Sequence, residues 1–409
     1  MEKYTIHHAD YEKDATKYIS AKGAFLINEN GSSIFDAGLG AGSQILGHCH
    51  DDVIHSLKEQ AERGILFLKN NPQIHLLAEQ LSCVLPHELK NFVFCNSGSE
   101  ATQRAIRYAR AATSKNKIAS FHGGWHGMNE WTLQDDGGRF GGQDIRLPSG
   151  IPLSILEHSI LLPYNDQLAF DILSQNKNQL AAICIEPIQG SNPRGDIISF
   201  LKKIEAFCKD NGILIIYDEI ITGFRLGIGG ACTKWKLNPD IVTYGKILGG
   251  GLPVGLVAFT DEVSQLTFKN KEKRILSGGT FSANPLMATT ACAVINCLKH
   301  RDYSLIDNLA STLREQTNKK LTELGIPCRL SGEASINRLY FTDIPIQNRA
   351  HRDQVELDTT IQQRFRENMM KLNVLWPTNG IIFTGFCHNK EMITEFGSKI
   401  ISALQITLE

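Results

Sequence analysis

Two stretches in the middle of the 409-residue chain decide the fold: residues 213–219 read ILIIYDE, and residues 241–251 read IVTYGKILGGG. Each is an apolar run without polar alternation that ends in charged residues or glycines. Such runs are typical of parallel strands that helices cover on both faces. In open α/β sheets the ligand site lies at the carboxyl ends of the strands. We therefore expect Asp218 and Lys246, which follow these two runs, to lie at a functional site.

Similar apolar runs recur along the chain, and each is followed by a turn and a helical pattern. This alternation predicts an α/β fold with a mostly parallel central sheet. One intervening helix is predicted over residues 199–209, where apolar residues recur with helical spacing before Asn211-Gly212. The further predicted strands are residues 92–95, 118–121, 181–185 and 256–259.

The pattern changes near residue 279. Beyond it, longer helical stretches (288–299, 304–324 and 357–372) alternate with short strands (336–342 and 381–384). We therefore predict a large α/β domain over residues 46–279 and a small α+β domain over residues 280–409. Residues 24–28 and 33–37 predict a hairpin about Glu29-Asn30-Gly31, and the N-terminal segment 1–45 is expected to complete the small domain.

The composition argues against several classes of protein. Lys and Arg number 42 against 43 Asp and Glu, so there is no basic surplus that predicts a nucleic-acid or membrane-surface partner. No run of about 18 apolar residues predicts a membrane span. The 10 cysteines show no CxxC pair and no zinc-binding spacing, which predicts free thiols in the cytoplasm and no metal site.

A phosphate site is suggested where an early strand ends in Ser97-Gly98-Ser99 before an alanine-rich helix. Small residues at a helix N-terminus let backbone N–H groups and hydroxyls approach an anion. The alternative is a plain capping box, in which Ser97 caps the helix and Glu100 lies three residues on. Judged alone, the segment fits both interpretations equally well.

Three further strand ends carry groups that suit a heterocyclic ligand. Trp125 stands among glycines, where its ring is either a platform for a flat heterocycle or simply packed in a turn. Glu186 and Asp218 end strongly apolar strands, where a carboxylate is costly unless it is paired. Asp218 is well placed to hold a protonated ring nitrogen, and the alternative for it is a helix N-cap.

Lys246 lies between an apolar strand and a run of glycines. That environment disfavours the ammonium form, and Schiff-base chemistry requires the neutral amine. A lone lysine is more often a solvated charge. Taken together, however, a phosphate site, an aromatic platform, a buried acid and this lysine describe a site for pyridoxal phosphate, whose ring carries a phosphate, a nitrogen and an aldehyde.

With these residues assembled, the chain resembles the class-III pyridoxal-phosphate aminotransferases, and within them the glutamate-1-semialdehyde 2,1-aminomutase subgroup. The resemblance implies fold type I, pyridoxal 5'-phosphate as the cofactor, and a homodimer with its active sites at the subunit interface. It runs from about Ala21 to the C-terminus through segments in family order: AKGAFLINENGSSIFD, ILGHCH, NSGSEATQRAIRYAR, GGWHG, LPSGIP, IEPIQG, YDEIITGFR, GKILGGGLPVG and GTFSANP.

The resemblance implies a role for each of the residues singled out above. Lys246 is similar to the lysine that forms the internal aldimine and then moves a proton between cofactor and substrate carbons. Asp218 matches the acid that binds the pyridine nitrogen. Residues 97–99 match the phosphate-binding Ser-Gly-Thr, with Ser99 in place of the threonine.

Further residues complete the cofactor site that the resemblance implies. Trp125 takes the ring-stacking position, where other members usually have Tyr or Phe, and Ile220 would cover the opposite face of the ring. Glu186 lies in the matching Glu-Pro segment. Thr280 looks like the hydroxyl that the neighbouring subunit gives to the phosphate, which would make dimerisation a condition of activity.

The chain departs from the aminomutase pattern at its substrate-binding positions. The aminomutase has an N-terminal Pro-Val-Arg motif whose arginine holds the substrate carboxylate, and unrelated residues stand before the matching part here. Its glutamate near the C-terminus is replaced within residues 376–381, WPTNGI. We therefore expect a substrate other than glutamate semialdehyde. Ser191 replaces an Asn and Ile221 replaces the Gln of other members, so Ser191 and Gln189 are the candidate partners of the cofactor's phenolic oxygen.

Residues 134–150 match the aminomutase's mobile gate in position, and the alternative is an ordinary flexible loop. Arg139, Arg146 and Arg338 are candidates for bidentate pairing with an anionic substrate, or else are surface or structural charges. Arg225 is expected to fix structure.

The leading prediction is an aminotransferase that moves an amino group from an amino donor to a small aldehyde or ketone, with Lys246 as general acid and base. The alternative is an aminomutase that shifts an amine within one molecule. A remote alternative is a non-catalytic or nucleotide-binding α/β protein. Against it, the chain has no P-loop and no GxGxxG motif, whereas Lys246 and Asp218 are both present.

Overall fold

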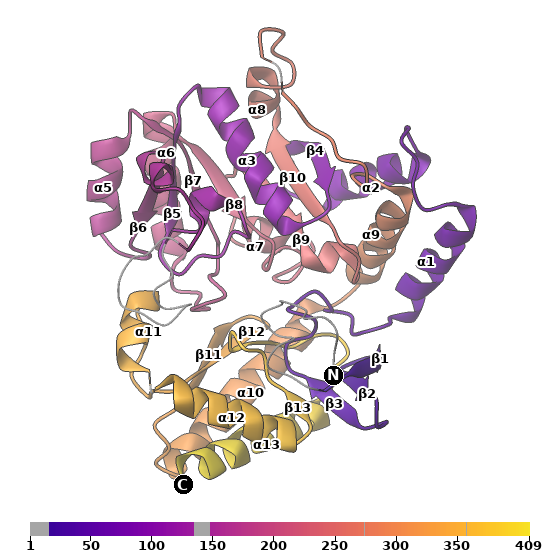
Figure 1. The fold of residues 1–409 in the computed structure, drawn as a ribbon, viewed down its shortest axis with the longest axis vertical. Helices are drawn as coiled ribbons and strands as arrows, with labels where there is room; N and C mark the ends of the chain where they lie inside the picture. Colours follow the sequence, from indigo (N-terminus) through magenta and orange to yellow (C-terminus); the bar gives the residue numbers. More distant parts are fainter. Residues whose placement is uncertain (1–15, 135–147, 274, 357) are drawn as a thin grey trace.

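The computed structural model describes residues 16–134 and 148–409, apart from residues 274 and 357. The chain forms two lobes (Figure 1). The larger lobe holds a seven-stranded sheet between helices, and the smaller lobe holds two short sheets and the C-terminal helices. Within these ranges, no helix combines the length and the apolar character that crossing a bilayer demands.

The large sheet has the strand order β4-β10-β9-β8-β7-β5-β6. Its strands are β4 (Leu89–Cys95), β5 (Lys117–Phe121), β6 (Ser159–Leu162), β7 (Leu180–Ile185), β8 (Leu214–Asp218), β9 (Ile241–Gly245) and β10 (Gly255–Thr260). β9, β8, β7, β5 and β6 pair in parallel, and β10 runs antiparallel to both β4 and β9. The mostly parallel sheet expected from the sequence is confirmed.

Helices cover both faces of this sheet. They are α1 (Asp51–Arg63), α2 (Pro72–Val84), α3 (Gly98–Thr113), α5 (Leu168–Asn176), α6 (Ile198–Asn211), α7 (Gly230–Lys234), α8 (Asp261–Leu266) and α9 (Pro285–Leu298). Ile183 of β7 lies in one hydrophobic cluster with Ile204 of α6, whereas its neighbour Cys184 lies in another with Ala105 of α3. Because successive residues of a strand face opposite sides, burial on both sides explains the missing polar alternation.

The smaller lobe joins the two ends of the described chain. One of its sheets has the order β1-β2-β3-β13 and the other β11-β12-β14. The elements are β1 (Tyr18–Lys22), β2 (Phe25–Asn28), β3 (Ser33–Asp36), α10 (Tyr303–Glu323), β11 (Arg329–Glu333), β12 (Ile336–Tyr340), α11 (Arg349–Val355), α12 (Thr359–Lys371), β13 (Val374–Leu375), β14 (Ile381–Phe383) and α13 (Lys390–Leu408). Phe35 of β3 shares a hydrophobic cluster with Trp376 and Phe396. β2 and β3 form the predicted antiparallel hairpin.

Helix α9 lies differently from the expected domain division, which assigned everything after residue 279 to the small domain. Ala291, Val294 and Ile295 of α9 belong to the same hydrophobic cluster as the large sheet, and the helix packs against α1 and α2. Helical periodicity alone does not say against which lobe a helix packs. We propose that the division between the lobes follows α9 and that the N-terminal strands belong to the smaller lobe.

Candidate active site

Strands of the large sheet end at one edge, and the predicted site residues follow them. Residues 97–99 follow β4, Trp125 follows β5, Glu186 follows β7, Asp218 ends β8 and Lys246 follows β9. Because β5, β7, β8 and β9 run parallel, their carboxyl ends meet at the same edge. β4 runs the same way, since β4 and β9 are both antiparallel to β10. The fold therefore gathers residues that lie far apart in the sequence.

The first turn of α3 forms a cradle for an anion. Ser97 Oγ accepts a hydrogen bond from the Glu100 N–H at 3.1 Å, and the Ala101 N–H donates to the Ser97 carbonyl at 3.1 Å. The N–H groups of Gly98 and Ser99 lie before the first helical hydrogen bond, where a helix offers them no partner of its own. The capping interpretation is thus realised, and the same turn still offers donors to a phosphate.

Close packing around this turn fixes its neighbours. A Cβ at Gly98 would lie 3.0 Å from Ile220 Cδ1, so Ile220 lies directly beside the cradle. Ser99 Oγ accepts a hydrogen bond from the Met128 N–H at 3.0 Å. Gly127 has a φ of 79°, and a Cβ there would lie 2.4 Å from Ser99 Oγ. Ser99 is therefore held between α3 and the loop that follows β5.

Asp218 is buried at the end of β8, with 3% of its surface exposed. Oδ1 accepts hydrogen bonds from the Ile220 N–H at 3.0 Å and from Thr243 Oγ1 at 3.1 Å, and Oδ2 lies 2.8 Å from His126 Nδ1. The bond to Ile220 is an Asx turn rather than a helix N-cap, because the next helix, α7, begins at Gly230. A buried carboxylate held in this way suits a protonated ring nitrogen.

His126 is a site residue that the sequence pattern did not reveal. Burial alone would lower the pKa of His126, but the neighbouring Cys184 and Asp218 outweigh it and raise the pKa well above its ordinary value. The His126 carbonyl accepts a hydrogen bond from Thr102 Oγ1 at 2.6 Å, which ties this loop to α3. We propose that His126 positions the Asp218 carboxylate. The signal in the sequence was its place directly after Trp125 at a strand end.

Glu186 supports the loop that carries Trp125. Its Oε2 accepts a hydrogen bond from the Trp125 N–H at 3.0 Å. Burial raises the pKa of Glu186 to about 7, and the nearby charge of His126 opposes the rise. Trp125 itself is 37% exposed, as a ring that stacks on a ligand must be.

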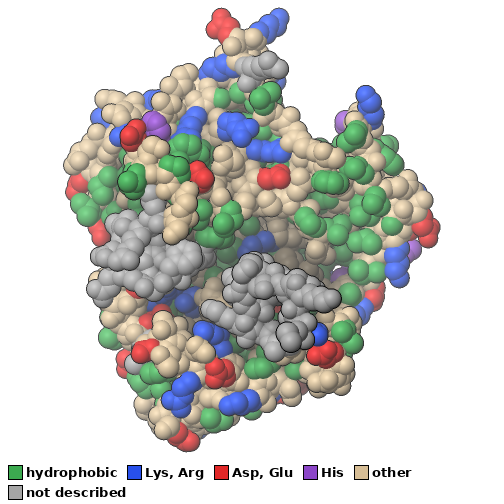
Figure 2. All heavy atoms as spheres, viewed as in Figure 1, with side chains coloured by type: hydrophobic (Ala, Val, Ile, Leu, Met, Phe, Trp, Pro, Cys, Tyr) green, Lys and Arg blue, Asp and Glu red, His purple; other side chains and the backbone are tan. Residues whose placement is uncertain are grey.

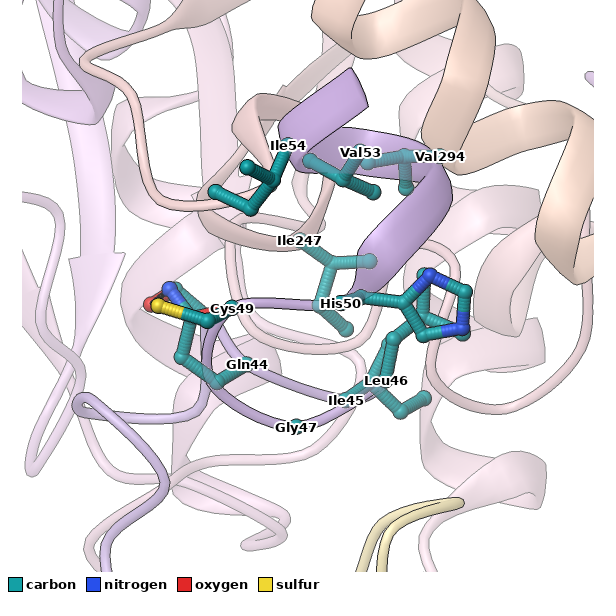
Figure 3. Close-up of a pocket in the computed structure, with 12 residues that line it drawn as sticks. Gln44, Ile45, Leu46, Gly47, Cys49, His50, Val53, Ile54, Ile247 and Val294 are labelled. Carbon is teal, nitrogen blue, oxygen red and sulfur yellow. Dashed lines mark hydrogen bonds between the residues drawn. The ribbon is translucent and has the colours of Figure 1, made fainter. Parts of the chain in front are cut away.

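Lys246 begins a 3₁₀ turn, Lys246–Gly249, directly after β9. Its φ is 41°, an unusual value for a residue with a side chain, and its Nζ donates to the Ala41 carbonyl at 2.9 Å. Ile247 and Gly250 line a cavity of about 20 Å³ together with residues of α1 and the loop before it (Figure 3). That cavity has room for one water molecule, so it is not the cofactor site.

The two candidate partners of the phenolic oxygen both bond to the loop after β5. Ser191 Oγ donates to the Gly123 carbonyl at 2.6 Å, and Gln189 Nε2 donates to the His122 carbonyl at 2.8 Å. Gln189 Oε1 is buried and has no hydrogen-bond partner in the described part of the chain. Because a buried acceptor without a partner is costly, we propose that a phenolic hydroxyl donates to Gln189 rather than to Ser191.

Other predicted residues lie away from the strand ends or outside the described ranges. Thr280 is exposed, on a segment that Tyr108 anchors to α3 by a 3.2 Å hydrogen bond to Ser277 Oγ. Arg225 is fully buried and donates to the carbonyls of Gly42 and Thr384, at 2.6 and 3.2 Å, so it fixes structure. Most of the predicted gate, with Arg139 and Arg146, lies outside the described residues.

The donors and acceptors at this edge fit pyridoxal 5'-phosphate. The cradle of α3 would bind the phosphate, and Asp218 would bind the protonated ring nitrogen. The unpaired oxygen of Gln189 would accept a hydrogen bond from the phenolic hydroxyl. Lys246 enters from the adjacent strand end and would supply the amine for the cofactor's carbonyl carbon. Fold and site together define a pyridoxal-phosphate-dependent enzyme of fold type I.

Comparison with known proteins identifies the family. The sequence profile of the class-III aminotransferases matches residues 8–327, and the chain belongs to this family. A glutamate-1-semialdehyde 2,1-aminomutase from Methanococcus maripaludis is 32% identical over 405 residues, which cover 95% of this chain and 90% of that protein. An enzyme of the same name from Sulfurisphaera tokodaii is 33% identical over 383 residues, 91% of this chain and 88% of that one. The resemblance seen in the motifs is confirmed.

Solved structures agree with this assignment. An omega-transaminase from Sphaerobacter thermophilus matches with a TM-score of 0.87 at 25% identity, covering 96% of this chain and 92% of its own. A glutamate-1-semialdehyde aminomutase from Pseudomonas aeruginosa has the same fold, with a TM-score of 0.84 at 18% identity over 96% of this chain and 88% of its own. The predicted fold type and the predicted cofactor, pyridoxal 5'-phosphate, are confirmed.

Proposed function

We propose that the protein is an aminotransferase that moves an amino group from an amino donor to a small aldehyde or ketone. The observation that carries this proposal is the apolar wall formed by Ile381, within the segment where the aminomutase pattern has a glutamate. A Cβ at Gly190 would lie 2.9 Å from Ile381 Cδ1 and 3.1 Å from Ile221 Cδ1, so both isoleucines line the loop that follows β7. Neither isoleucine offers an acid or a base, which leaves proton transfer to Lys246.

The residues of the chain divide the work of the proposed reaction. The cofactor, when bound, supplies an electron sink for the substrate carbon that loses its proton. Lys246 Nζ would act as the base that takes that proton and as the acid that returns it to carbon. Asp218, held by His126, would keep the ring nitrogen protonated. Trp125 and Ile220 would cover the two faces of the ring and exclude water from them.

An aminomutase is the second candidate. It is favoured by the names of the curated relatives, which are aminomutases at 32% and 33% identity over most of the chain. An aminomutase needs no external amino donor and releases no oxo acid. The two candidates therefore differ in a product that is easily measured.

We propose in addition that the enzyme is a homodimer in which Thr280 reaches the partner's phosphate. Leu276 and Phe281, on either side of Thr280, are 65% and 62% exposed. Figure 2 shows further exposed hydrophobic side chains gathered over α1 and α2, on the right of the view. Ile65 and Leu68, in the segment that follows α1, are 55% and 74% exposed. Exposed apolar surface on this scale is typical of a subunit interface. Sedimentation at twice the mass of one chain is the expected result.

The partners of the proposed enzyme are small molecules, and its proposed location is the cytoplasm. Cys49 and Cys83 are exposed free thiols, which suits a reducing compartment. The cysteines Cys95, Cys184, Cys208, Cys232, Cys292 and Cys328 are buried and also free.

The visible spectrum of the purified holoenzyme tests the proposed function. We expect the bound cofactor's absorption to bleach when glutamate or alanine is added, with release of the matching oxo acid. A second aldehyde or ketone should restore the absorption. Turnover of glutamate semialdehyde with no donor and no oxo acid would identify an aminomutase instead.

A further inference from the structure

Arg338 carries a buried guanidinium with an unused donor. It lies in the middle of β12 with 8% of its surface exposed. Nη1 donates to the Asn379 carbonyl, but Nε is buried without a hydrogen-bond partner among the described residues. Burial lowers the pKa of Arg338 to about 10, so the group is still charged at neutral pH. A buried cation is costly unless an anion meets it.

Like charges crowd this guanidinium. Arg349 and Arg352 of α11 are both buried, and the positive charge of each lowers the pKa of Arg338 further. The nearby carboxylates are already engaged: Asp353 lies 2.7 Å from both arginines, and Glu356 lies 3.3 Å from Arg352 Nε. Neither carboxylate bonds to Arg338 Nε, which has no hydrogen-bond partner among the described residues.

The side of β12 that carries Arg338 faces the loop after β7. Tyr340 lies two residues on and therefore on the same side of the strand, and its Oη donates to Asn192 Oδ1 at 2.6 Å. Across the strand pair, Arg338 is opposite Ile381 of β14. Ile381 is the residue whose Cδ1 would lie 2.9 Å from a Cβ at Gly190. Arg338 thus lies between two contacts to one loop of the candidate active site.

The other arginines border the same site. Arg352 Nη1 donates to the Ser191 carbonyl at 2.8 Å. A Cβ at Gly123, two residues before Trp125, would lie 2.6 Å from Arg349 Cβ. The cluster therefore touches both loops that the candidate site uses on this side, the loop after β5 and the loop after β7.

We propose that Arg338 binds a carboxylate of the substrate, so that the protein acts on amino acids and oxo acids in preference to simple amines. This inference rests on the proposed function. The contact with Asn379 occupies Nη1 and leaves the edge formed by Nε and Nη2, which matches a carboxylate in the bidentate arrangement. A bound carboxylate gives Nε its missing partner and places a negative charge beside the buried guanidinium.

A purely structural role for Arg338 is the competing explanation. Its Nη1 also holds the turn before β14, where Gly380 has a φ of 72° and a Cβ would lie 3.3 Å from Nη1. If Arg338 only held this turn, its replacement would affect all substrates alike, because it would change the shape of the wall. Loss of a carboxylate-binding group affects only substrates that carry a carboxylate.

The test uses the holoenzyme and pairs of amino donors in which a methyl group replaces the carboxylate. The pairs are alanine with 2-aminopropane and 4-aminobutanoate with 1-aminobutane, and bleaching of the cofactor is followed at increasing concentration. In R338M we expect the half-saturating concentration of a carboxylate donor to rise at least about 30-fold, and that of its amine partner to stay nearly constant. R338K should recover part of the loss, because it keeps the charge without the planar fork.

R314M is the matched control. Arg314 contacts the same strand region without facing the site, since its Nη1 donates to the Ala334 carbonyl at 3.0 Å and to Asn337 Oδ1. Its replacement should change both members of a donor pair alike. Equal changes for both members in R338M, or no change for the carboxylate donor, would overturn the inference.

A binding measurement separates this inference from the proposed function. A wild-type holoenzyme that no donor bleaches contradicts the proposed aminotransferase, and the role of Arg338 is then judged by binding alone. Glutarate and propanoate, which carry no amine, should raise the Tm of the wild-type holoenzyme and not that of R338M. A wild type that neither carboxylate stabilises, or an R338M that is stabilised as much, contradicts the inference.

Discussion

The carboxyl edge of the large sheet and the wall of the smaller lobe opposite it place their functional groups in different ways. At the sheet edge, Asp218 and Lys246 each stand at or directly after the end of a strand. On the wall, Arg338 and Ile381 lie within paired strands, and Arg352 lies on a helix. The edge groups are positioned by the point where each strand ends. The wall groups are positioned by packing between segments that are remote in the sequence.

The difference separates two tasks. The groups at the edge suit the cofactor, whereas we propose that the groups on the wall face the substrate. Changes at the edge should therefore abolish turnover of every substrate. Changes on the wall, such as those proposed for Arg338, should alter the choice among substrates.

The largest effect is expected at Lys246. Lys246→Ala removes the amine that binds the cofactor's carbonyl and moves the proton, so we expect the rate of the half-reaction to fall by about 10⁴-fold for every donor. Stopped-flow bleaching of the loaded enzyme measures it. Lys299→Ala, at an exposed lysine directly after α9, is the control and should retain the wild-type rate. If the rate of Lys246→Ala lay within tenfold of the wild-type rate, Lys246 would not be the group that transfers the proton.

The next effect is expected at Asp218. Asn in its place cannot stabilise a protonated ring nitrogen, so we expect Asp218→Asn to lower kcat by about 10³-fold for all donors. The matched control is Asp240→Asn, because Asp240 is a partly buried carboxylate beside the first residue of β9, at the opposite edge of the sheet, where it accepts a hydrogen bond from the Ile215 N–H at 2.8 Å. Similar losses of kcat in the two variants would mean that sheet stability, rather than the site, is being measured.

The sequence predicted the edge far better than the wall, and the reason is physical. A strand that is buried on both faces is an unbroken apolar run, so its end is visible as the first polar residue, as at Asp218. His126 was missed because its partner lies on another strand, and nothing local marks a histidine as buried. Arg338 could be named only as one of three candidate arginines, because burial and the neighbours on α11 depend on tertiary packing.

The same contrast explains what the sequence left open in the fold. Strands β4, β5, β7, β8, β9 and β10 were predicted, whereas β1, β6, β11 and β13 were not. Helix α9 was found as a helix but was expected in the small domain, because an apolar helical pattern does not specify which lobe covers it.

A pH-dependent effect on stability is expected at Glu186. Between about pH 4.5 and about pH 7 the folded protein keeps this proton and the unfolded chain releases it, so stability falls as the pH rises through that window. The stability of Glu186→Gln relative to wild type should therefore increase by up to about 3 kcal/mol between pH 4.5 and pH 8. Urea unfolding of the cofactor-free protein measures the difference. Glu157→Gln, at an exposed glutamate, should show no such trend.

The smallest effect is expected at Gly127, which lies between the edge and α3. The Cβ of an alanine there would lie 2.4 Å from Ser99 Oγ, and the backbone has a φ of 79°. We therefore expect a loss of about 2 kcal/mol in stability together with weaker cofactor binding. Gly150→Ala separates the two causes, since Gly150 has a φ of 93° but open space around it. If both variants bind the cofactor equally well, Ser99 is not part of the phosphate cradle.

The position of the cofactor's covalent attachment tests the central claim most directly. The enzyme is loaded with pyridoxal 5'-phosphate, reduced with borohydride, digested and mapped by mass spectrometry. We predict that the phosphopyridoxyl group is found on Nζ of Lys246, at the turn after β9. Attachment to any other lysine, or no attachment in an enzyme that binds the cofactor, would contradict the assignment of the active site to this edge of the sheet.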